Sequence, residues 1–327
     1  RSKLVALIHG GDDYTCVPIQ GSGTFAVESM IGGLTNEKSK ILLLINGAYG
    51  YRMKKICDYL KREYIIYETN EDKPPDVNIV EKKIQNYQDI THILAVHCET
   101  TSGILNPIEE IARLAKQKNI KIYIDAMSSF GSLPIDLRNY PYDAIAASSN
   151  KCLEGVPGVG FVILKKNILS ESSNNSHSLS LDLYDQWKAI ESNGQWRFTP
   201  PTHVLAALHE ALIQLEEEGG IEKRFQRYSN NCKIILEGMT GLGFESFLTN
   251  NIQAPIIITF YKPKSPNYNF ERFYQLLAEK NYLIYPGKIT NAETFRIGCI
   301  GSLGKKEIEG ALKAIKEVVK EMNIFKI

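Results

Sequence analysis

The sequence has no excess of either charge. Its 327 residues contain 38 Lys and Arg against 37 Asp and Glu, which gives a formal net charge of +1 at pH 7. A nucleic-acid scaffold would show a basic excess, so this class of function is disfavoured. Apolar residues make up 43% of the chain and charged residues 23%. These are ordinary values for a globular protein, and they argue against disorder.

Long apolar runs are also missing. The run Ile41–Ile45 is strand-sized, whereas a membrane helix needs about 20 apolar residues. The start of the chain lacks the charged and apolar regions of a secretion signal, so we expect a soluble, cytoplasmic protein. The chain opens at Arg1 without an initiator Met, in a segment typical of the inside of an element. We therefore expect it to be a piece of a longer protein.

Cysteine and histidine patterns are absent where a metal site or a disulfide framework would need them. No CxxC pair occurs, and the histidines form no HExxH motif. His92 and His97 are five residues apart, which suits neither face of a helix. We expect reduced thiols and no metal. The six scattered cysteines are Cys16, Cys57, Cys98, Cys152, Cys232 and Cys299.

The first two-thirds of the chain alternates strand-like and helix-like segments. Short apolar strands that alternate with amphipathic helices predict βαβ units, and hence an α/β fold with a mostly parallel sheet buried on both faces. We expect strands at 15–20, 41–45, 63–67, 91–96, 121–124, 144–147 and 160–164, and helices at 24–31, 47–60 and 108–117.

The remainder has a different pattern. A Ser- and Asn-rich stretch at 170–180 reads as a loop, and a helix at 202–218 ends in Gly219-Gly220, a typical C-cap. The rest of the chain predicts an α+β unit. It consists of a helix at 221–238, strands at 254–261 and 295–299, and a helix at 305–322. We therefore expect a large domain at 1–205 and a smaller C-terminal domain at 206–327.

Polar and small residues follow each predicted strand of the large domain. Ligands of open α/β sheets bind beyond the carboxyl ends of the strands, so these residues belong to one candidate site. The set includes hydroxyls, the aromatic ring of Tyr49, the acid Asp125 and the lysine Lys151, which suits a flat, phosphorylated cofactor with a basic nitrogen. It consists of 21–24 (GSGT), 46–50 (NGAYG), 97–103 (HCETTSG), 125–127 (DAM) and 148–151 (SSNK).

The glycine-rich segment 21–26 (GSGTFA) fits the GxGxxA pattern of dinucleotide-binding folds. Those folds place an acid at the end of the next strand, whereas here that strand ends in Asn46-Gly47. No Gly-Lys-Ser/Thr follows, so a Walker A loop is excluded too. A helix N-terminus with the hydroxyls of Ser22 and Thr24 suits a single phosphate. A tight turn with a helix cap is the alternative.

Lys151 and Asp125 each follow a predicted strand. Lys151 is either a solvated loop residue or an amine desolvated in a cleft, where it could act as a nucleophile. Asp125 is either a helix N-cap or a buried charge that needs a cationic partner. A protonated pyridine nitrogen is such a partner, and a Lys–Asp pairing is what a pyridoxal phosphate site requires. Together the two residues favour the cleft.

Two further residues have alternative interpretations. Tyr49 could stack on a flat ring or belong to the core. Arg296 is a charge in the middle of a predicted strand, flanked by Phe295 and Ile297. It is either solvated or directed away from the core into the cleft between the domains. In the cleft its guanidinium would suit a substrate carboxylate or phosphonate.

With these residues in place, the chain resembles the fold type I pyridoxal-phosphate aminotransferases of class V. The resemblance runs from about Tyr14 to the C-terminus. Within the class, the motifs are most similar to those of the transaminases that use 2-aminoethylphosphonate and pyruvate. The motifs are 20–28 (QGSGTFAVE), 97–103 (HCETTSG), 124–131 (IDAMSSFG) and 149–158 (SNKCLEGVPG).

The resemblance implies roles for the residues around the cofactor ring. Lys151 would form the covalent link to the cofactor, and Asp125 would pair with the ring nitrogen. Tyr49 would lie over one face of the ring, where relatives often have Trp, and Met127 would pack on the other. Thr100 or Thr101 would approach the phenolic oxygen.

The resemblance also implies how anions are held. Ser22, Gly23 and Thr24 would bind the cofactor phosphate, with Asn150 beside them. Thr199 matches a threonine that reaches the phosphate of the neighbouring subunit in the family, which implies a homodimer with shared active sites. Arg296 matches the arginine that holds the substrate anion.

The implied reaction is transamination of 2-aminoethylphosphonate with pyruvate, giving phosphonoacetaldehyde and L-alanine. The alternatives are another class V aminotransferase of the alanine–glyoxylate or serine–pyruvate type, a lyase or cysteine desulfurase, and a cofactor-binding piece of a larger bifunctional phosphonate enzyme. Family members carry several dozen residues ahead of the point where this chain begins, which is why the last alternative is kept.

Overall fold

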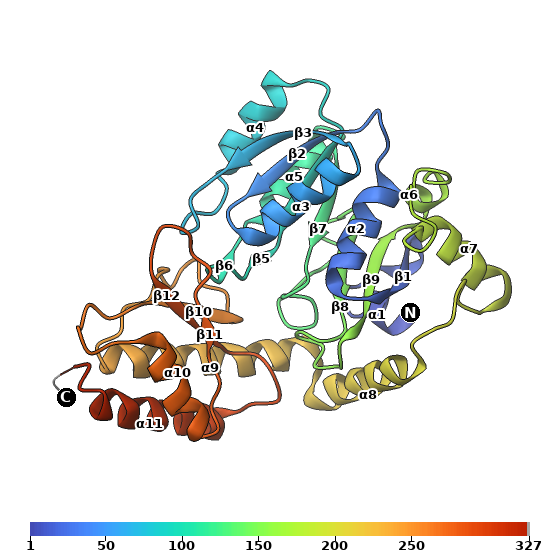
Figure 1. The fold of residues 1–327 in the computed structure, drawn as a ribbon. Helices are drawn as coiled ribbons and strands as arrows, with labels where there is room; N and C mark the ends of the chain where they lie inside the picture. Colours follow the sequence, from blue (N-terminus) through green and yellow to red (C-terminus); the bar gives the residue numbers. More distant parts are fainter. Residues whose placement is uncertain (326–327) are drawn as a thin grey trace.

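A seven-stranded sheet forms the centre of the large domain (Figure 1). The computed structural model describes residues 1–325. The strand order is β1-β9-β8-β7-β4-β2-β3, in which β8, β7, β4, β2 and β3 are parallel and β9 is antiparallel to both its neighbours. The strands are β1 (Tyr14–Gly21), β2 (Lys40–Ile45), β3 (Glu63–Glu68), β4 (His92–Val96), β7 (Lys121–Asp125), β8 (Ala144–Ser148) and β9 (Gly158–Lys165).

Helices cover both faces of this sheet, which is why its strands are apolar throughout. Side chains alternate between the faces along each strand. In β2, Leu42 and Leu44 pack in one buried cluster, whereas Leu43 and Ile45 pack in the other. One face is covered by α1 (Ser2–Ala6), α4 (Val77–Asn86), α5 (Ile108–Gln117) and α8 (Thr202–Glu218), the other by α2 (Gly23–Leu34), α3 (Ala48–Tyr59), α6 (Lys166–Ser170) and α7 (Leu183–Asn193).

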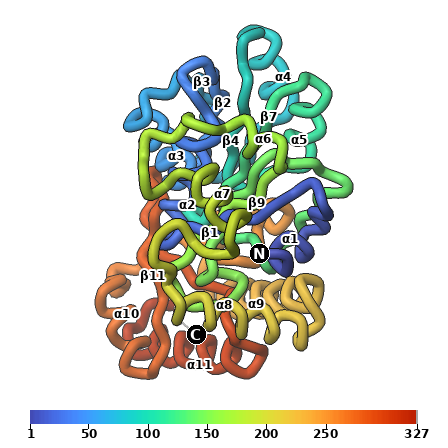
Figure 2. Tube along the Cα trace, turned by 90° about the vertical axis from the view of Figure 1, so that its right-hand side faces the viewer, coloured from blue at the N-terminus to red at the C-terminus, as the bar shows by residue number. Residues whose placement is uncertain are grey.

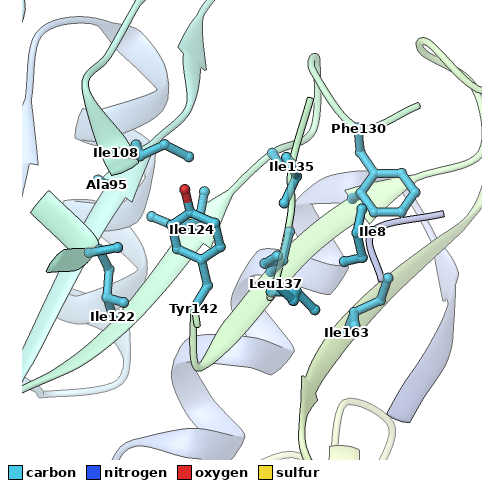
Figure 3. Close-up of a cluster of buried hydrophobic side chains, with 14 of the residues drawn as sticks. Ile8, Ala95, Ile108, Ile122, Ile124, Phe130, Ile135, Leu137, Tyr142 and Ile163 are labelled. Carbon is cyan, nitrogen blue, oxygen red and sulfur yellow. The ribbon is translucent and has the colours of Figure 1, made fainter. Parts of the chain in front are cut away.

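Figure 3 shows part of the buried cluster that contains Leu42 and Leu44. Ile122 and Ile124 of β7 project from the same side of the sheet toward Ile108 of α5 and toward Tyr142. All four side chains are at most 2% exposed. The strand that ends at Asp125 is therefore anchored in the core on this face, which fixes where its last residue lies.

The small domain is built around a three-stranded antiparallel sheet of order β10-β12-β11. Its core is rich in phenylalanine, and the buried ring of Phe295 in β12 contacts Phe244, Phe260 and Phe273. Figure 2 shows this domain at one end of the molecule. Its elements are α9 (Gly220–Gly241), β10 (Ile257–Tyr261), α10 (Phe270–Glu279), β11 (Tyr285–Pro286), β12 (Thr294–Gly298) and α11 (Lys305–Glu321).

The predicted α/β fold with a mostly parallel sheet is confirmed, and the helices expected at 108–117 and 202–218 have the predicted bounds. Five helices, α1, α4, α6, α7 and α10, were not expected. In α4, α7 and α10 the N-caps, Asp76, Asp182 and Asn269, each accept a backbone N–H through the side chain. These capping residues were visible in the sequence. The amphipathic pattern of α4 and α10, which buries Val80 and Ile84 in one and Phe273, Leu276 and Leu277 in the other, was visible too and was not recognised.

The domain boundary near residue 205 stays a prediction. Leu208 and Leu215 of α8 pack in a core cluster of the large sheet, whereas Ile235 and Met239 of α9 belong to the core of the small domain. Helix α8 is thus packed with the large domain, and α9 runs from one core to the other. Among residues 1–325, no helix combines the length and apolarity that crossing a membrane requires.

We expect Leu43→Ala to destabilise the large domain strongly. Leu43 is fully buried between β2 and its covering helices, and truncation of such a side chain costs about 2–5 kcal/mol through lost burial and a residual cavity. Urea unfolding followed by circular dichroism measures this. Tyr59→Ala is the control, because Tyr59 is 78% exposed and should change the free energy of unfolding by no more than about 0.5 kcal/mol. Equal effects of the two substitutions would contradict this packing.

Candidate active site

The carboxyl ends of the parallel strands place the predicted residues at one edge of the sheet. Strand β7 lies between β4 and β8, with Asp125 paired to Val96 and to Ala146. The segment after β4 is tied to this edge, since the His97 N–H donates to the Asp125 carbonyl oxygen over 2.9 Å. The loops that carry the three central motifs therefore begin side by side.

Asp125 is a buried carboxyl group at the end of β7. It is 4% exposed, and its Oδ1 accepts one hydrogen bond, from the Met127 backbone N–H at 2.9 Å. Burial raises the pKa of Asp125 to about 6, although this hydrogen bond and the charge of Arg52 act in the opposite direction. A buried carboxylate with so little compensation favours binding of a cation beside it.

Lys151 lies in the turn that follows β8. Gly155 N donates to Ser149 O over 2.8 Å and Glu154 N to Lys151 O over 2.9 Å, which closes the turn. The lysine itself is exposed. The turn places the side chain at the surface of the edge, and the role of Lys151 as the amine that binds the cofactor stays a prediction. Asn150 is fixed from the strand end, where its Oδ1 accepts from Ser148 Oγ at 2.9 Å.

Ser22, Gly23 and Thr24 stand at the N-terminus of α2. Ser22 is the N-cap, and its side chain makes no capping hydrogen bond, so its hydroxyl is left for a ligand. A side chain on Gly23 would come within 2.1 Å of Met127 Sδ, so only glycine allows Met127 to lie this close. Thr24 Oγ1 accepts from Arg52 Nη1 at 3.0 Å. The result is a helix N-terminus with an added guanidinium, which is suited to an anion.

Tyr49 lies at the start of α3 between two cations. The guanidinium carbon of Arg52 is 4.6 Å from the ring centroid, and Lys288 Nζ is 5.1 Å from it. Lys288 Nζ also donates to the Tyr49 hydroxyl over 3.3 Å. Burial acts to raise the pKa of Tyr49, but hydrogen bonding to Thr100 and the two positive charges outweigh it and lower the pKa.

Glu99 fixes the N-terminus of α3. Its Oε2 accepts from the backbone N–H groups of Tyr49 and Gly50, both at 3.1 Å. Its Oε1 accepts from Thr101 N at 3.1 Å and from Thr101 Oγ1 at 2.6 Å. Thr101 Oγ1 in turn accepts from Ala48 N at 2.8 Å. One fully buried carboxylate thus ties Tyr49 to the segment that carries Thr100 and Thr101, and burial raises its pKa.

Arg296 reaches this edge from the small domain. It lies in β12, the central strand, yet its Nη1 donates to the Thr100 carbonyl oxygen over 2.7 Å and its Nε to Pro286 O over 3.0 Å. The residue is 6% exposed, and burial lowers the pKa of its guanidinium. Within residues 1–325, both recorded hydrogen bonds of this side chain go to backbone carbonyl oxygens. A buried cation paired with carbonyl groups favours binding of an anion.

Thr199 lies in a different part of the surface. It is exposed and lines a cavity of about 840 Å³ together with Gly21 and Phe25 of the same chain. The cavity thus borders the segment just before Ser22. None of the hydrogen bonds described above involves Thr199.

Three residues of this edge were missed from the sequence: Arg52, Glu99 and Lys288. Arg52 follows Tyr49 by three positions on one helix, a spacing that places both on the same face. Glu99 could have been inferred because the N-cap of α3 is Gly47, which has no side chain with which to cap the helix. No feature of the sequence indicates Lys288, since it comes from a loop of the small domain.

Comparisons with known proteins agree with the predicted family. The profile of the family described as aminotransferase class-V matches residues 1–292. A 2-aminoethylphosphonate–pyruvate transaminase of Pseudomonas fluorescens is 52% identical over 99% of this chain and 88% of its own length, and one of Pseudomonas aeruginosa is 50% identical over the same shares. The predicted resemblance is therefore confirmed.

Solved structures give the same fold. Pyridoxamine–pyruvate aminotransferase from Mesorhizobium loti superposes with a TM-score of 0.90 at 20% identity, covering 98% of this chain and 83% of that one. Alanine–glyoxylate aminotransferase from Nostoc sp. gives 0.88, also at 20% identity, covering 97% and 86%. Together with the family profile and the close relatives, this shows that the chain belongs to the class V aminotransferase family.

Proposed function

We propose that the protein transfers the amino group of 2-aminoethylphosphonate to pyruvate, with pyridoxal 5'-phosphate as cofactor, giving phosphonoacetaldehyde and L-alanine. Relatives at 50–52% identity over 99% of the chain carry the name of this reaction. The observation that carries the proposal is the buried carboxyl group of Asp125, at the end of the strand next to the one that leads to Lys151.

The residues at the edge fit the parts of this cofactor. Asp125 has the burial and the unsatisfied negative charge that a protonated ring nitrogen would compensate. The close approach of Gly23 and Met127 provides a flat surface for a ring. Thr24 at the N-terminus of α2, together with Arg52 of α3, would hold the phosphate. Ser22 and Asn150 would add their polar side chains to this phosphate site.

Bound pyridoxal phosphate supplies an electron sink for the negative charge that is left when a proton leaves the substrate. We assign the proton transfer to Lys151, whose Nζ would accept the proton from the carbon that bears the amino group. Lys151 lies three residues after the end of β8, the strand next to the one that ends at Asp125. Tyr49 and Met127 would restrict the orientation of the ring, and Thr100 or Thr101 would contact its phenolic oxygen.

Arg296 would bind the anionic group of the substrate. Its guanidinium is already buried against Thr100 O and so needs little further ordering. A phosphonate carries more negative charge than a carboxylate, and a second cation favours it. Lys288, held at the Tyr49 hydroxyl, would supply this second charge. The two cations together are our physical reason for favouring a phosphonate over an α-amino acid as donor.

We also infer a homodimer in the cytoplasm. Phe25 and Phe198 border the cavity that Thr199 lines and are each 44% exposed, which leaves an apolar surface that a second copy would cover. In this arrangement Thr199 would contribute to the phosphate site of the neighbouring subunit. Sedimentation of wild-type protein and of Phe198→Asp would test the interface.

Purified protein with added cofactor is expected to form L-alanine from 2-aminoethylphosphonate and pyruvate, and Lys151→Ala is expected to lose at least about a hundredfold in rate, the usual contribution of a general base. Product alanine is measured by amino-acid analysis, and the cofactor by its visible absorbance. The variant should retain some cofactor through the phosphate contacts. It should lose the visible absorbance band of the covalent link between the cofactor and Lys151, the band that borohydride removes.

Lys316→Ala is the matched control, since Lys316 is exposed on α11. It should leave both readouts unchanged. Wild-type activity in Lys151→Ala would overturn the role of this lysine. A preference of the wild-type protein for an α-amino acid donor would overturn the phosphonate assignment.

In cofactor-free protein, we expect Asp125→Asn to be more stable than the wild type at pH 8. The pKa of Asp125 is raised to about 6 by burial. Its contribution to stability is therefore fully present below the unfolded-state pKa of about 3.9 and is lost as the pH rises through about 6. Asparagine stays neutral and can still accept the Met127 N–H. The gain is at most about 3 kcal/mol.

Urea unfolding of both proteins at pH 4.5 and pH 8 measures this difference. The wild type should lose stability between the two values relative to Asp125→Asn. With cofactor and substrates present, Asp125→Asn should be less active than the wild type, because its neutral amide cannot balance the positive charge of a protonated ring nitrogen. Identical pH slopes for the two proteins would show that the Asp125 carboxyl is not buried as described.

We expect Arg296→Gln to raise the KM for 2-aminoethylphosphonate by about a hundredfold, since loss of a charged hydrogen-bonding partner costs about 1.5–3 kcal/mol. Cofactor absorbance should change little, because Arg296 contacts the backbone carbonyl oxygen of Thr100, whereas the cofactor would contact the Thr100 side chain. Initial rates at varied substrate measure the effect. Arg272→Gln, at an exposed ion pair on α10, is the control, and an equal KM change in both variants would contradict the assignment.

A further inference from the structure

A cluster of four charged residues, one of them buried and three partly buried, joins the turn that carries Lys151 to helix α9 and to the end of α8. The cluster consists of two acids, Glu154 and Glu218, and two arginines, Arg224 and Arg227. Glu154 follows Lys151 by three positions. The charges of the cluster cancel, so it does not itself attract a ligand.

Glu154 combines an unfavourable backbone with a dense set of side-chain partners. Its φ is +60°, in the left-handed region that residues with a Cβ avoid. Its carboxylate is 13% exposed and accepts from the Tyr228 hydroxyl and from Arg227 Nη2, the latter at 2.9 Å. Arg224 Nη2 lies 3.7 Å away. Backbone strain of this kind persists only where the surroundings enforce it, and it clusters at functional sites.

Arg224 holds the turn from a second direction. Its side chain is 2% exposed, and its Nη1 donates to Cys152 O over 2.9 Å. Cys152 directly follows Lys151, so the guanidinium fixes the peptide next to the lysine. Buried ion pairs seldom add net stability over apolar packing. A role in positioning therefore explains the cluster better than a role in stability.

The same stretch of α9 also forms hydrogen bonds with the loop that follows β12, the strand that carries Arg296. Arg227 Nη1 donates to Gly301 O, and Gly301 N donates to the Tyr228 hydroxyl over 3.3 Å. Asn231 Nδ2 donates to Cys299 O at 3.1 Å and to Leu303 O at 3.0 Å. Tyr228 and Arg227 thus contact the Lys151 turn on one side and the loop after β12 on the other.

We propose that Glu154 is a positioning residue, which through Arg224, Arg227 and Tyr228 fixes the Lys151 turn relative to the strand that carries Arg296. The proposal rests on the function proposed above for Lys151 and Arg296. Its consequence is that the amine and the substrate anion are aligned by one helix. Loss of the carboxylate would misplace the amine without removing any group that touches the substrate.

The test compares Glu154→Gln with Glu154→Gly in the cofactor-loaded enzyme. Glutamine keeps the side-chain length and the backbone strain but removes the charge, whereas glycine removes the charge and relieves the strain. We expect both variants to lose about tenfold or more in kcat with the KM for pyruvate nearly unchanged, since misplacement of a reacting group by 1 Å can cost about a hundredfold. The midpoint of the pH titration of the cofactor's visible absorbance should also shift in both.

Tyr228→Phe provides a milder second variant that removes one hydrogen bond from Glu154, and it should shift both readouts in the same direction. It decides the question if either Glu154 variant fails to fold. Glu216→Gln is the control, because Glu216 is exposed and pairs only at the surface with Lys3. It should match the wild type.

The outcomes separate this proposal from the function on which it rests. If Glu154→Gly or Tyr228→Phe keeps the wild-type kcat and absorbance titration, the positioning role is overturned while the transaminase function stands. If the variants change only thermal stability, the cluster is structural and the proposal is again wrong. If wild-type protein binds the cofactor without a visible band or any transfer, the proposed function itself fails.

Discussion

The burial of a carboxyl group at the end of β7 is the constraint on which the site depends. Asp125 is held there because Ile122 and Ile124 anchor its strand in the core, and because parallel neighbours on both sides leave the carboxyl ends as the open edge. A charge in such a place is unfavourable alone. The structure offers it one backbone hydrogen bond, and burial raises its pKa to about 6. In the proposed function, a protonated ring nitrogen would balance the charge.

Glu99 is a buried carboxylate whose hydrogen-bonding partners all come from the protein itself. It is as buried as Asp125, and burial raises the pKa of both. Glu99, however, accepts four hydrogen bonds from Tyr49, Gly50 and Thr101, whereas one is recorded for Asp125. Glu99 and Asp125 thus differ in the number of hydrogen bonds they accept and not in burial. This difference is why we assign Glu99 a structural role and propose Asp125 as the ligand-binding acid.

The sequence was informative where the physics is local. The aliphatic strands, Asp125 at a strand end and the small residues before α2 were all predicted from neighbouring residues. The contacts that complete the site join residues far apart in the chain, such as Arg52 with Thr24 and Arg296 with Thr100. Neither contact is visible in a local pattern. The sequence left open whether Lys151 is exposed, because exposure depends on how a turn closes rather than on strand periodicity.

The site residues differ in charge balance from the chain as a whole. Over the whole chain the acids and bases nearly cancel, yet the residues described above for the site comprise four cations, Arg52, Lys151, Lys288 and Arg296, and the two acids Asp125 and Glu99. Since Glu99 is satisfied within the protein, its charge is not available to the cations. The local excess of positive charge therefore results from placement by the fold and not from composition. The proposed function would use these cations for two strongly anionic groups, a cofactor phosphate at Arg52 and a substrate phosphonate at Arg296, and would use the Asp125 carboxylate for the cationic ring nitrogen.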